Sequence, residues 1–251
     1  SRGLGDVYKR QFLNIFNEKP IFSRKEVIHI MKIICSKSNL LKSVSISLKA
    51  VPSKTTMPIL ECILIDATTN QIKFTTNDME LGIETIVEGT IEEKGMVALN
   101  AKIFYEIIRR LPDNDVTIKT DEKFAATITC EKAKFNIPGK SGEDFAYLPI
   151  IEKDEPLTIS QYTLKEMIRQ TIFSIAVNEN NKLMTGELFE IKNNCLKVVS
   201  LDGHRISIRK MSLKKDYSDR KVVVPGKTLS EVSKILSGAV SYTHLTLPTK
   251  L

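Results

Sequence analysis

Residues that could carry out acid–base catalysis are few in this chain. His204 follows Asp202 in a turn and could pair with it, but no nucleophile motif accompanies the two residues. The other histidines, His29 and His244, lie in terminal segments that are set apart below. A catalytic site needs several converging groups, and the chain has no phosphate-binding loop of the full pattern Gly, any four residues, Gly, Lys, and then Ser or Thr. The sequence therefore predicts a protein that is not an enzyme and that uses no cofactor.

The acidic residues and cysteines do not have the spacing of a metal site. Asp78 and Asp202 could be imagined as the metal pair of a nuclease. They occupy equivalent positions in two repeats, however, so they are expected to lie far apart and to cap turns. The cysteines lie in apolar stretches without a Cys/His ligand pattern; they are Cys35, Cys62, Cys130 and Cys195. Reduced, buried thiols of a cytosolic protein are expected, and no metal site is predicted.

Lysine and arginine are concentrated in four segments with helical spacing. The whole chain has a formal charge of +7. The four segments carry ten Lys and Arg against three Glu, whereas the rest of residues 31–238 is acidic. This segregation predicts one surface for a polyanion, because Lys and Arg bind phosphates without reading sequence. Any one helix could simply have a solvated charged face. Aromatic residues do not alternate with the cations, so a duplex backbone is favoured over stacked single strands.

Short strands make up most of the chain, and the four helices interrupt them. Strand-like runs recur between turn signals such as Pro112-Asp113-Asn114. The expected helices cover about residues 37–51, 102–111, 160–177 and 227–236. Each has apolar residues on one face, so each is expected to pack on a sheet. The pattern predicts an α+β fold.

The elements repeat at a spacing of 123 to 125 residues. VALNAKIFYEIIRRL at 97–111 aligns with VVVPGKTLSEVSKIL at 222–236, and QIKFTTND at 71–78 aligns with CLKVVSLD at 195–202. The order strand, helix, strands also recurs inside each copy, so each domain is expected to consist of two βαβββ halves. We therefore predict tandem domains at residues 31–154 and 155–238, with a linker near Glu152–Pro156. The second domain is expected to be truncated after its second helix.

The two ends are expected not to belong to the folded protein. DVYKRQ near the start and VSYTH near the end can be encoded by opposite strands of one short DNA element that resembles a transposon-based sequencing adapter. Residues 239–251 are therefore predicted to be an adapter-like tail. Residues 1–30 are predicted to be a non-native, disordered extension before a native start at Met31; a genuine short extension is the alternative. No signal peptide or bilayer-spanning apolar run is present.

Six landmarks of the central part resemble the bacterial sliding clamp family, the beta subunit of DNA polymerase III. They follow one another in the family's order from Met31 to about Gly238: MKIICSKSNLLKSV, TTMPIL, FTTNDMELGI, NAKIFYEIIRRLP, SGEDFAYLP and SLDGHRISI. The resemblance implies a DNA-clamp fold and a homodimeric ring with three domains in each chain. Helices would line the inner wall of that ring, and antiparallel sheets would form its rim. It also implies a non-catalytic processivity factor, of which this chain covers roughly two domains.

The resemblance assigns roles to two sets of residues. The cations expected to face DNA are Lys54, Lys102, Lys182 and Lys227, of which Lys182 stands where the family can have an aromatic residue. The residues expected to line a pocket for partner peptides are Met184, Leu201, Gly203, His204, Arg205 and Ile206. The chain departs from the family at Leu201, where a smaller polar residue is familiar, and at Met184, where leucine is. Both changes keep the pocket apolar. The rest of the pocket belongs to the segment that is missing.

The implied partners are duplex DNA, bound without sequence preference, and proteins that carry short peptide motifs. These proteins are the replicative polymerase, the clamp loader and repair proteins, met in the bacterial cytoplasm and at the nucleoid during replication, with no membrane involved. Two other classes remain open, a non-ring DNA-binding scaffold and a peptide-docking scaffold whose basic face is incidental. Retention on circular but not linear DNA separates a ring from the first, and salt sensitivity separates it from the second.

Overall fold

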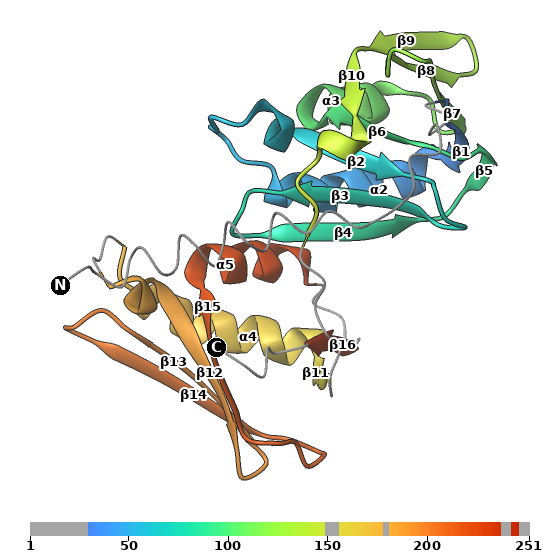
Figure 1. Cartoon of the computed structure of the whole chain (residues 1–251). Coiled ribbons are helices and arrows are strands. Elements are labelled where there is room, and N and C mark those ends of the chain that lie inside the picture. The colour runs from blue at the N-terminus through green and yellow to red at the C-terminus, as the bar shows by residue number, and fades with distance from the viewer. Residues whose placement is uncertain (1–29, 149–155, 178–180, 237–241, 246–251) are drawn as a thin grey trace, which may run out of the picture.

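The computed structural model describes residues 30–148, 156–177, 181–236 and 242–245, which form two domains in succession (Figure 1). Domain one comprises the described residues up to 148, and domain two comprises those from 156 onward. Most of the predicted linker, residues 152–155, lies outside the described residues. None of the helices in the described part of the chain is long and apolar enough to cross a membrane.

Domain one consists of two halves with the same order of elements. The first half contains β1 (Lys32–Ser36), α2 (Lys37–Ser47), β2 (Cys62–Asp66), β3 (Ile72–Asn77) and β4 (Gly82–Val87). The second half contains β6 (Met96–Asn100), α3 (Ala101–Arg110), β7 (Asp115–Thr120), β8 (Ala126–Cys130) and β9 (Ala133–Ile137). Short edge strands follow each half, β5 (Thr90–Glu93) and β10 (Gly139–Ser141). The α+β fold with two βαβββ halves is thus confirmed in domain one.

The two halves of domain one exchange their first strands. One antiparallel sheet has the order β5-β1-β7-β8-β9, and the other has the order β10-β6-β2-β3-β4. Because β1 joins the strands of the second half and β6 joins those of the first, neither half completes its sheet alone. Helices α2 and α3 bury Val44, Phe104 and Ile108 in a core shared with both sheets. The rings of Phe74 and Phe104 meet there edge to face, with centroids 6.1 Å apart.

Domain two repeats the same plan. It contains β11 (Leu157–Ser160), α4 (Gln161–Thr171), β12 (Gly186–Lys192), β13 (Cys195–Leu201), β14 (Ile206–Ser212), β15 (Arg220–Pro225) and α5 (Gly226–Ile235). The sheet order β14-β13-β12-β15 matches β4-β3-β2-β6 of domain one, strand for strand. A hydrogen bond at the helix end is repeated as well. The Thr76 hydroxyl donates to the Ser47 carbonyl at 2.6 Å, and the Ser200 hydroxyl donates to the Thr171 carbonyl at 2.5 Å. The tandem repeat predicted from the sequence is therefore present in the backbone.

Strand β16 (Tyr242–Leu245) lies in the segment for which the sequence predicts an adapter-like tail. It pairs antiparallel with β11, with Tyr242 opposite Ser160 and Leu245 opposite Leu157. In domain one β7 pairs with β1 in the same way. The backbone of residues 242–245 therefore takes the position of β7. Backbone pairing does not reveal which DNA encodes a strand, so the origin of this tail stays a prediction.

Two helices end earlier than their apolar periodicity predicts. Helix α2 ends at Ser47 and α4 at Thr171, and each is followed by a short 3-10 turn, η1 (Leu48–Ala50) and η4 (Ile172–Ser174). Near the first end, Pro52 forces Val51 into an extended conformation. At the second, the Thr171 hydroxyl lies 2.8 Å from the Met167 carbonyl of the preceding turn, a contact that bends helices.

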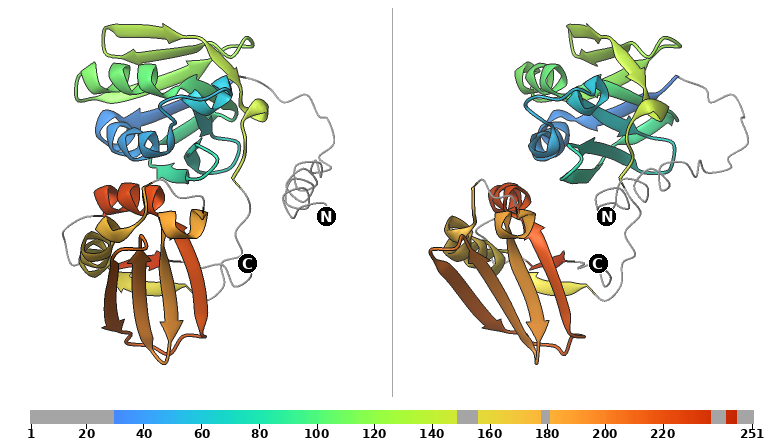
Figure 2. Two further views of the ribbon diagram at one scale, coloured as in Figure 1. Left: turned by 90° about the vertical axis from the view of Figure 1, so that its left-hand side faces the viewer. Right: turned by 60° about the vertical axis from the view of Figure 1, so that its left-hand side comes forward.

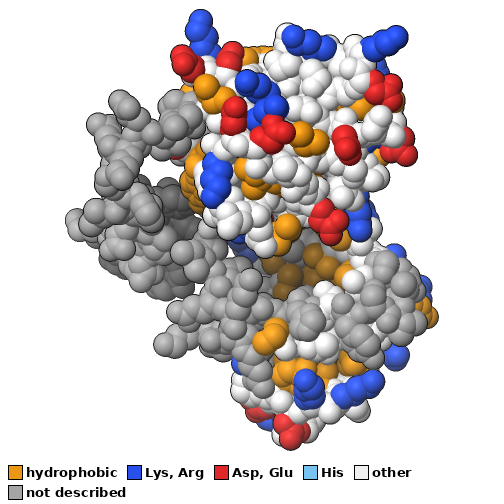
Figure 3. Space-filling view, turned by 90° about the vertical axis from the view of Figure 1, so that its right-hand side faces the viewer, with side chains coloured by type: hydrophobic (Ala, Val, Ile, Leu, Met, Phe, Trp, Pro, Cys, Tyr) orange, Lys and Arg blue, Asp and Glu red, His pale blue; other side chains and the backbone are white. Residues whose placement is uncertain are grey.

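The helices of both domains lie toward one side of the molecule, as the left view of Figure 2 shows. Helix α2 packs on α3, and α4 packs on α5. Figure 3 shows the molecule from the side opposite to the left view of Figure 2. Basic and acidic side chains are interspersed there over domain one, and apolar side chains line a hollow between the two domains. The left view of Figure 2 thus agrees with the prediction that the helices gather on one wall.

Candidate DNA interface and partner-docking surface

The four cations predicted to face DNA stand in two different environments. Lys54 lies in the loop before η2 (Pro58–Glu61), Lys102 near the start of α3, and Lys182 at the start of η5 (Lys182–Thr185). All three are exposed, and none forms an ion pair within the described part of the chain. Lys227, near the start of α5, is different because it reaches domain one.

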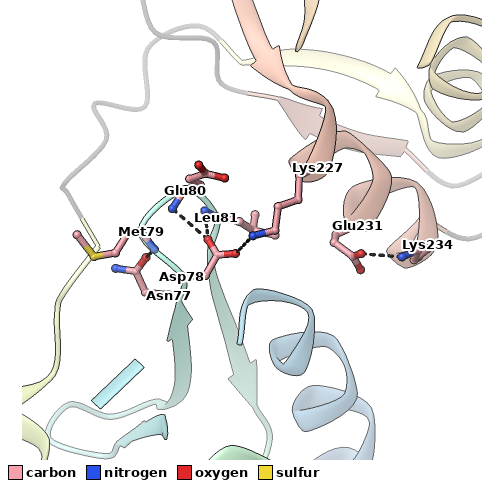
Figure 4. A network of polar contacts seen from close by, with 8 residues as sticks. All are labelled: Asn77, Asp78, Met79, Glu80, Leu81, Lys227, Glu231 and Lys234. Carbon is pink, nitrogen blue, oxygen red and sulfur yellow. Dashed lines mark hydrogen bonds and ion pairs between the residues drawn. The ribbon is translucent and has the colours of Figure 1, made fainter. Parts of the chain in front are cut away.

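Lys227 joins the two domains through an ion pair. Its Nζ lies 2.5 Å from Oδ2 of Asp78, which lies in the turn between β3 and β4 (Figure 4). The Asp78 side chain is only 3 % exposed, whereas that of Lys227 is 57 % exposed. The other oxygen of Asp78 accepts from the backbone N–H groups of Glu80 and Leu81. Asp78 therefore caps its own turn with one oxygen and holds the second domain with the other.

This ion pair shifts the titration of both partners. Burial on its own would raise the pKa of Asp78. Hydrogen bonds from Lys227 and from the Leu81 and Glu80 N–H groups outweigh burial and lower that pKa below its ordinary value. The pKa of Lys227 is raised, chiefly by its hydrogen bond to Asp78. Both groups are therefore charged at neutral pH.

The turn that carries Asp78 has a close copy in domain two, between β13 and β14. There Oδ1 of Asp202 accepts from the N–H groups of His204 and Arg205, each at 3.1 Å. Gly203 has a φ of 85°, and Met79 of the first copy has a φ of 73°. The second oxygen of Asp202 accepts from Nε of Arg205 at 2.8 Å. The structure thus confirms that both aspartates cap turns, and Asp202 contacts the backbone of His204 rather than its imidazole.

Many of the remaining helix cations are paired on their own helix. Arg109 pairs with Glu106 of α3, Arg169 with Glu166 of α4, and Lys234 with Glu231 of α5. On α2 and the following turn no acid is present, and two exposed lysines there form no ion pair within the described residues; they are Lys42 and Lys49. The net positive charge of the helix wall lies mainly on domain one, as the residue types of the four segments already indicate.

A surface pocket of about 320 Å³ lies at the start of α3. It is lined by Lys102, Ile103, Glu106, Ile107, Arg110 and Phe135. Ile103 is 50 % exposed and Phe135 is 39 % exposed. Lys102 therefore stands beside exposed apolar side chains, whereas its repeat equivalent Lys227 is held at the junction of the domains.

The predicted peptide-pocket residues come from two neighbouring segments. Leu201 and Ile206 are direct partners across β13 and β14, and Gly203, His204 and Arg205 form the turn between them. Met184 lies in η5, and its carbonyl accepts from the Ala176 N–H at 2.9 Å. Arg205 stacks over the Phe173 ring at 6.0 Å, which links the turn to the segment that follows α4. The segment after α4 therefore joins the two groups of predicted residues.

The structure adds apolar residues that the sequence analysis does not single out. We define the exposed apolar cluster as Phe173, Val177, Leu183, Leu201 and Ile206, which are between 36 % and 86 % exposed. Phe173, Val177 and Leu183 are new in this set. Phe173 and Val177 lie off the apolar stripe of the helix predicted at 160–177, so a large apolar residue at either position is expected to face solvent. That offset is the signal in the sequence that would have identified them.

Groups that could hold a metal ion are absent among the described residues. On the face of the domain-two sheet turned away from the helices, Glu190 accepts from Lys197 at 3.2 Å and from Lys221 at 2.9 Å. These cations are neutralised in part by Glu190. The chemistry that the surface offers is therefore phosphate binding by the lysines of α2 and α3 and apolar contact at the exposed apolar cluster.

Comparison with known proteins gives relatives that are named as sliding clamps. The "Beta sliding clamp" of Bacillus subtilis is 37 % identical over 216 residues, which cover 82 % of this chain and 57 % of the relative. The "Beta sliding clamp" of Halalkalibacterium halodurans is 36 % identical over 199 residues, which cover 75 % of this chain and 52 % of the relative. The chain thus spans about half the length of these curated relatives.

Two solved structures agree with these relatives. The DNA polymerase III beta subunit of Eubacterium rectale superposes with a TM-score of 0.84 and 67 % sequence identity, covering 85 % of this chain and 59 % of that chain. The sliding clamp of Bacillus subtilis superposes with a TM-score of 0.83 and 33 % identity, covering 87 % of this chain and 60 % of that chain.

Two family models match the chain in succession. The N-terminal domain of the DNA polymerase III beta subunit matches residues 31–149, and the central domain of the same subunit matches residues 158–251. The second match extends through the segment predicted to be an adapter-like tail. The two matches together cover most of the chain, in the order of the domains seen in the fold, so the chain belongs to the DNA polymerase III beta subunit family.

Proposed function

We propose that this chain forms two domains of a DNA sliding clamp, a non-catalytic processivity factor that encircles duplex DNA and tethers the replicative polymerase. The observation that carries the proposal is the tandem repeat with the helices of both domains toward one side (Figure 2). A closed ring of such domains presents those helices to its hole. Topology then retains the DNA, so individual phosphate contacts can stay weak and allow sliding.

The DNA-facing residues we propose are the exposed lysines of the helix side. Lys42 and Lys49 on α2 and the turn after it, together with Lys54 and Lys102, have no partner acid among the described residues and are free to meet phosphate. Lys182 is exposed as well and belongs to the same proposal. Lys227 is a weaker candidate, because its charge is already matched by Asp78 at the junction of the domains. Binding through these groups is independent of sequence.

The partner-docking surface we propose is the exposed apolar cluster together with the turn at Gly203. Large apolar side chains that remain exposed on a folded domain are typical of a protein-binding surface. The polymerase, the clamp loader and repair proteins would dock here through short apolar peptides. Because such a clamp would work on bacterial chromosomal DNA, we expect these partners to bind it in the cytoplasm and at the nucleoid.

A chimera tests the ring. Residues 31–236 of this chain would replace the matching part of the Eubacterium rectale subunit, whose remaining length has no counterpart in the match. After loading onto nicked circular plasmid by a clamp loader, the chimera should stay on the circle and be lost when the plasmid is cut once. Equal retention on circular and cut DNA would point instead to a non-ring DNA-binding scaffold.

The salt dependence of DNA retention distinguishes a clamp from a peptide-docking scaffold. A clamp held on DNA partly by lysine–phosphate contacts should load less well as salt rises. A peptide-docking scaffold with an incidental basic face should keep its partners and show almost no dependence of DNA retention on salt.

A further inference from the structure

The carboxyl group of Glu187 is enclosed in the core of domain two. Glu187 is 0 % exposed and lies on β12, on the face that also carries the core residues Phe189 and Ile191. The repeat-equivalent residue of domain one is Ile63, which is also 0 % exposed. Domain two therefore holds an acid where domain one holds an aliphatic side chain, and nothing in the proposed DNA or peptide contacts uses it.

Hydrogen-bond geometry favours the neutral form of this acid. Oε1 of Glu187 lies 2.9 Å from Oγ1 of Thr171, and Oε2 is buried without any hydrogen-bond partner. Oγ1 of Thr171 also lies 2.8 Å from the Met167 carbonyl, and a hydroxyl has a single hydrogen to donate. A protonated Glu187 satisfies both contacts, because it donates to Thr171, which in turn donates to Met167. An ionised Glu187 would take that hydrogen and leave its second oxygen charged and unpaired.

Charged groups that could stabilise an ionised Glu187 are engaged elsewhere. On α4, Arg169 pairs with Glu166, and the Lys165 ammonium donates to the Leu236 carbonyl. On α5, Lys227 pairs with Asp78, and Lys234 pairs with Glu231. From β13 the nearest polar group of this network is the Ser200 hydroxyl, which donates to the Thr171 carbonyl. Burial therefore raises the pKa of Glu187 to about 7, and the Thr171 hydrogen bond offsets only part of that rise.

Glu187 lies where the three segments that carry the exposed apolar cluster meet. Thr171, its hydrogen-bond partner, is the last residue of α4 and is followed at once by η4, which bears Phe173. Ser200, bonded to the Thr171 carbonyl, precedes Leu201 at the end of β13. Glu187 itself is the second residue of β12, directly after η5, which bears Leu183. The buried carboxyl of Glu187 is thus connected to all three segments, through its hydrogen bond with Thr171, through the bond of Thr171 to Ser200, and through its own place in the chain after η5.

We propose that protonation of Glu187 holds these three segments together, so that the exposed apolar cluster is a proton-sensitive docking surface that loosens as the carboxyl ionises. The direction of this pH effect follows from the raised pKa of Glu187. The folded protein favours the neutral acid, so the cost of ionisation begins above the ordinary value of 4.5 and is complete above about pH 7. The segments around the cluster are therefore firmest on the acidic side of neutrality and less firm above it.

Nuclear magnetic resonance of the full chain, without any binding partner, tests whether Glu187 protonation holds the three segments together; we call this role of Glu187 the brace. The Glu187 carboxyl carbon should titrate near neutrality, and the amides of Phe173, Ser174 and Leu201 should shift with the same midpoint. Glu187→Gln, which stays neutral at every pH, should abolish this shared midpoint. Glu190→Gln, on the solvent face of the same strand, should leave it unchanged. Amides that keep the midpoint in Glu187→Gln, or a carboxyl that titrates near its ordinary value, would overturn the proposal.

A second variant covers the case in which glutamine fails to fold at this site. Glu187→Ile copies the residue that domain one holds at the equivalent position, so its side chain suits a site of this shape. It should melt at a temperature independent of pH between about 6 and 8, whereas the unchanged chain should melt at a lower temperature as the pH rises through this range. If the melting temperatures of Glu187→Ile and of the unchanged chain changed with pH in the same way, the proposal would be wrong.

Peptide binding supplies a separate arm, which rests on the proposed docking function. The affinity of an apolar peptide should fall by about threefold or more between pH 6 and pH 8 in the unchanged chain and stay level in Glu187→Gln. His204 is present in both proteins, so the difference between their profiles isolates Glu187. Absence of peptide binding with the shared midpoint intact would contradict only the docking function. Binding with the same pH profile in both proteins would contradict the brace.

Discussion

The Lys227 ammonium of domain two lies 2.5 Å from the nearly enclosed carboxylate of Asp78 in domain one. The two residues are 149 positions apart in the sequence, and their contact fixes how α5 meets the turn between β3 and β4. Because the Lys227 side chain is 57 % exposed, solvent screens much of the attraction, and the pair acts more as a positioning contact than as a large source of stability.

A double-mutant cycle measures this contact. Asp78→Asn keeps an oxygen for the turn, and Lys227→Met keeps the aliphatic stem. Their coupling free energy, from urea unfolding at pH 7, is expected to be about 1 kcal/mol. Because the pKa of Asp78 is lowered in the folded protein, this stabilisation is present above the ordinary pKa of an aspartate and is lost as the pH falls through the lowered value. Lys102→Met is the control and should change stability little. A coupling that keeps its full size when Asp78 is protonated would contradict the ionic account.

Removal of lysines from α2 should weaken DNA binding through salt dependence. Lys42→Ala and Lys49→Ala should each reduce the slope of log affinity against log salt by about 1, for duplexes of any sequence. Fluorescence anisotropy with a labelled duplex measures the slope. Lys221→Ala, on the sheet face turned away from the helices, is the matched control. An equal loss of slope in Lys221→Ala would mean that the DNA does not select the helix side.

Polar substitutions in the exposed apolar cluster should weaken peptide docking. Phe173→Ser or Ile206→Ser removes apolar area that a bound peptide would cover, and a tenfold loss of affinity, about 1.4 kcal/mol, is expected for each. Isothermal titration with an apolar peptide of a polymerase measures it. Ile86→Ser alters a comparably exposed residue on β4 and should bind as before. Peptide affinity unchanged by both cluster variants would place the docking surface elsewhere.

Replacement of Gly203 should cost stability through the backbone alone. Its φ of 85° disfavours a side chain, while a Cβ built there meets nothing within 4 Å. Gly203→Ala should therefore lower the free energy of unfolding by about 1 kcal/mol without a packing defect. Gly203→Asn should lose less, because asparagine tolerates this region better. Urea unfolding compares the two, and equal losses would argue against a backbone origin.

Much of the fold follows from periodicity and repetition in the sequence. The alignment of 97–111 with 222–236 predicts that α3 and α5 follow equivalent strands, and the sheet orders agree. The capping role of Asp78 and Asp202 also follows from local chemistry, because an aspartate before a tight turn accepts from N–H groups two and three residues on. Such features depend on neighbours in the chain, and neighbours are visible in the sequence.

Features that depend on distant parts of the chain were not predicted. The pairing of Lys227 with Asp78 requires knowing how two domains meet, and the sequence shows Lys227 only as one more helix cation. The apolar periodicity predicts a longer α4, because it does not show that the hydroxyl of Thr171 interacts with both the helix backbone and a buried acid on β12. Phe173 is a different case, because its offset from the apolar stripe of the helix predicted at 160–177 is visible in the sequence.

The Asp78 and Asp202 turns are two copies of one corner, with matching caps and matching left-handed residues at Met79 and Gly203. In the first copy a lysine from the next domain occupies the free carboxylate oxygen. In the second copy an arginine of the same turn does so, and apolar side chains around it remain open. Duplication of the domain has therefore produced one corner that is occupied by an interdomain ion pair and a second corner whose apolar surroundings stay accessible to solvent.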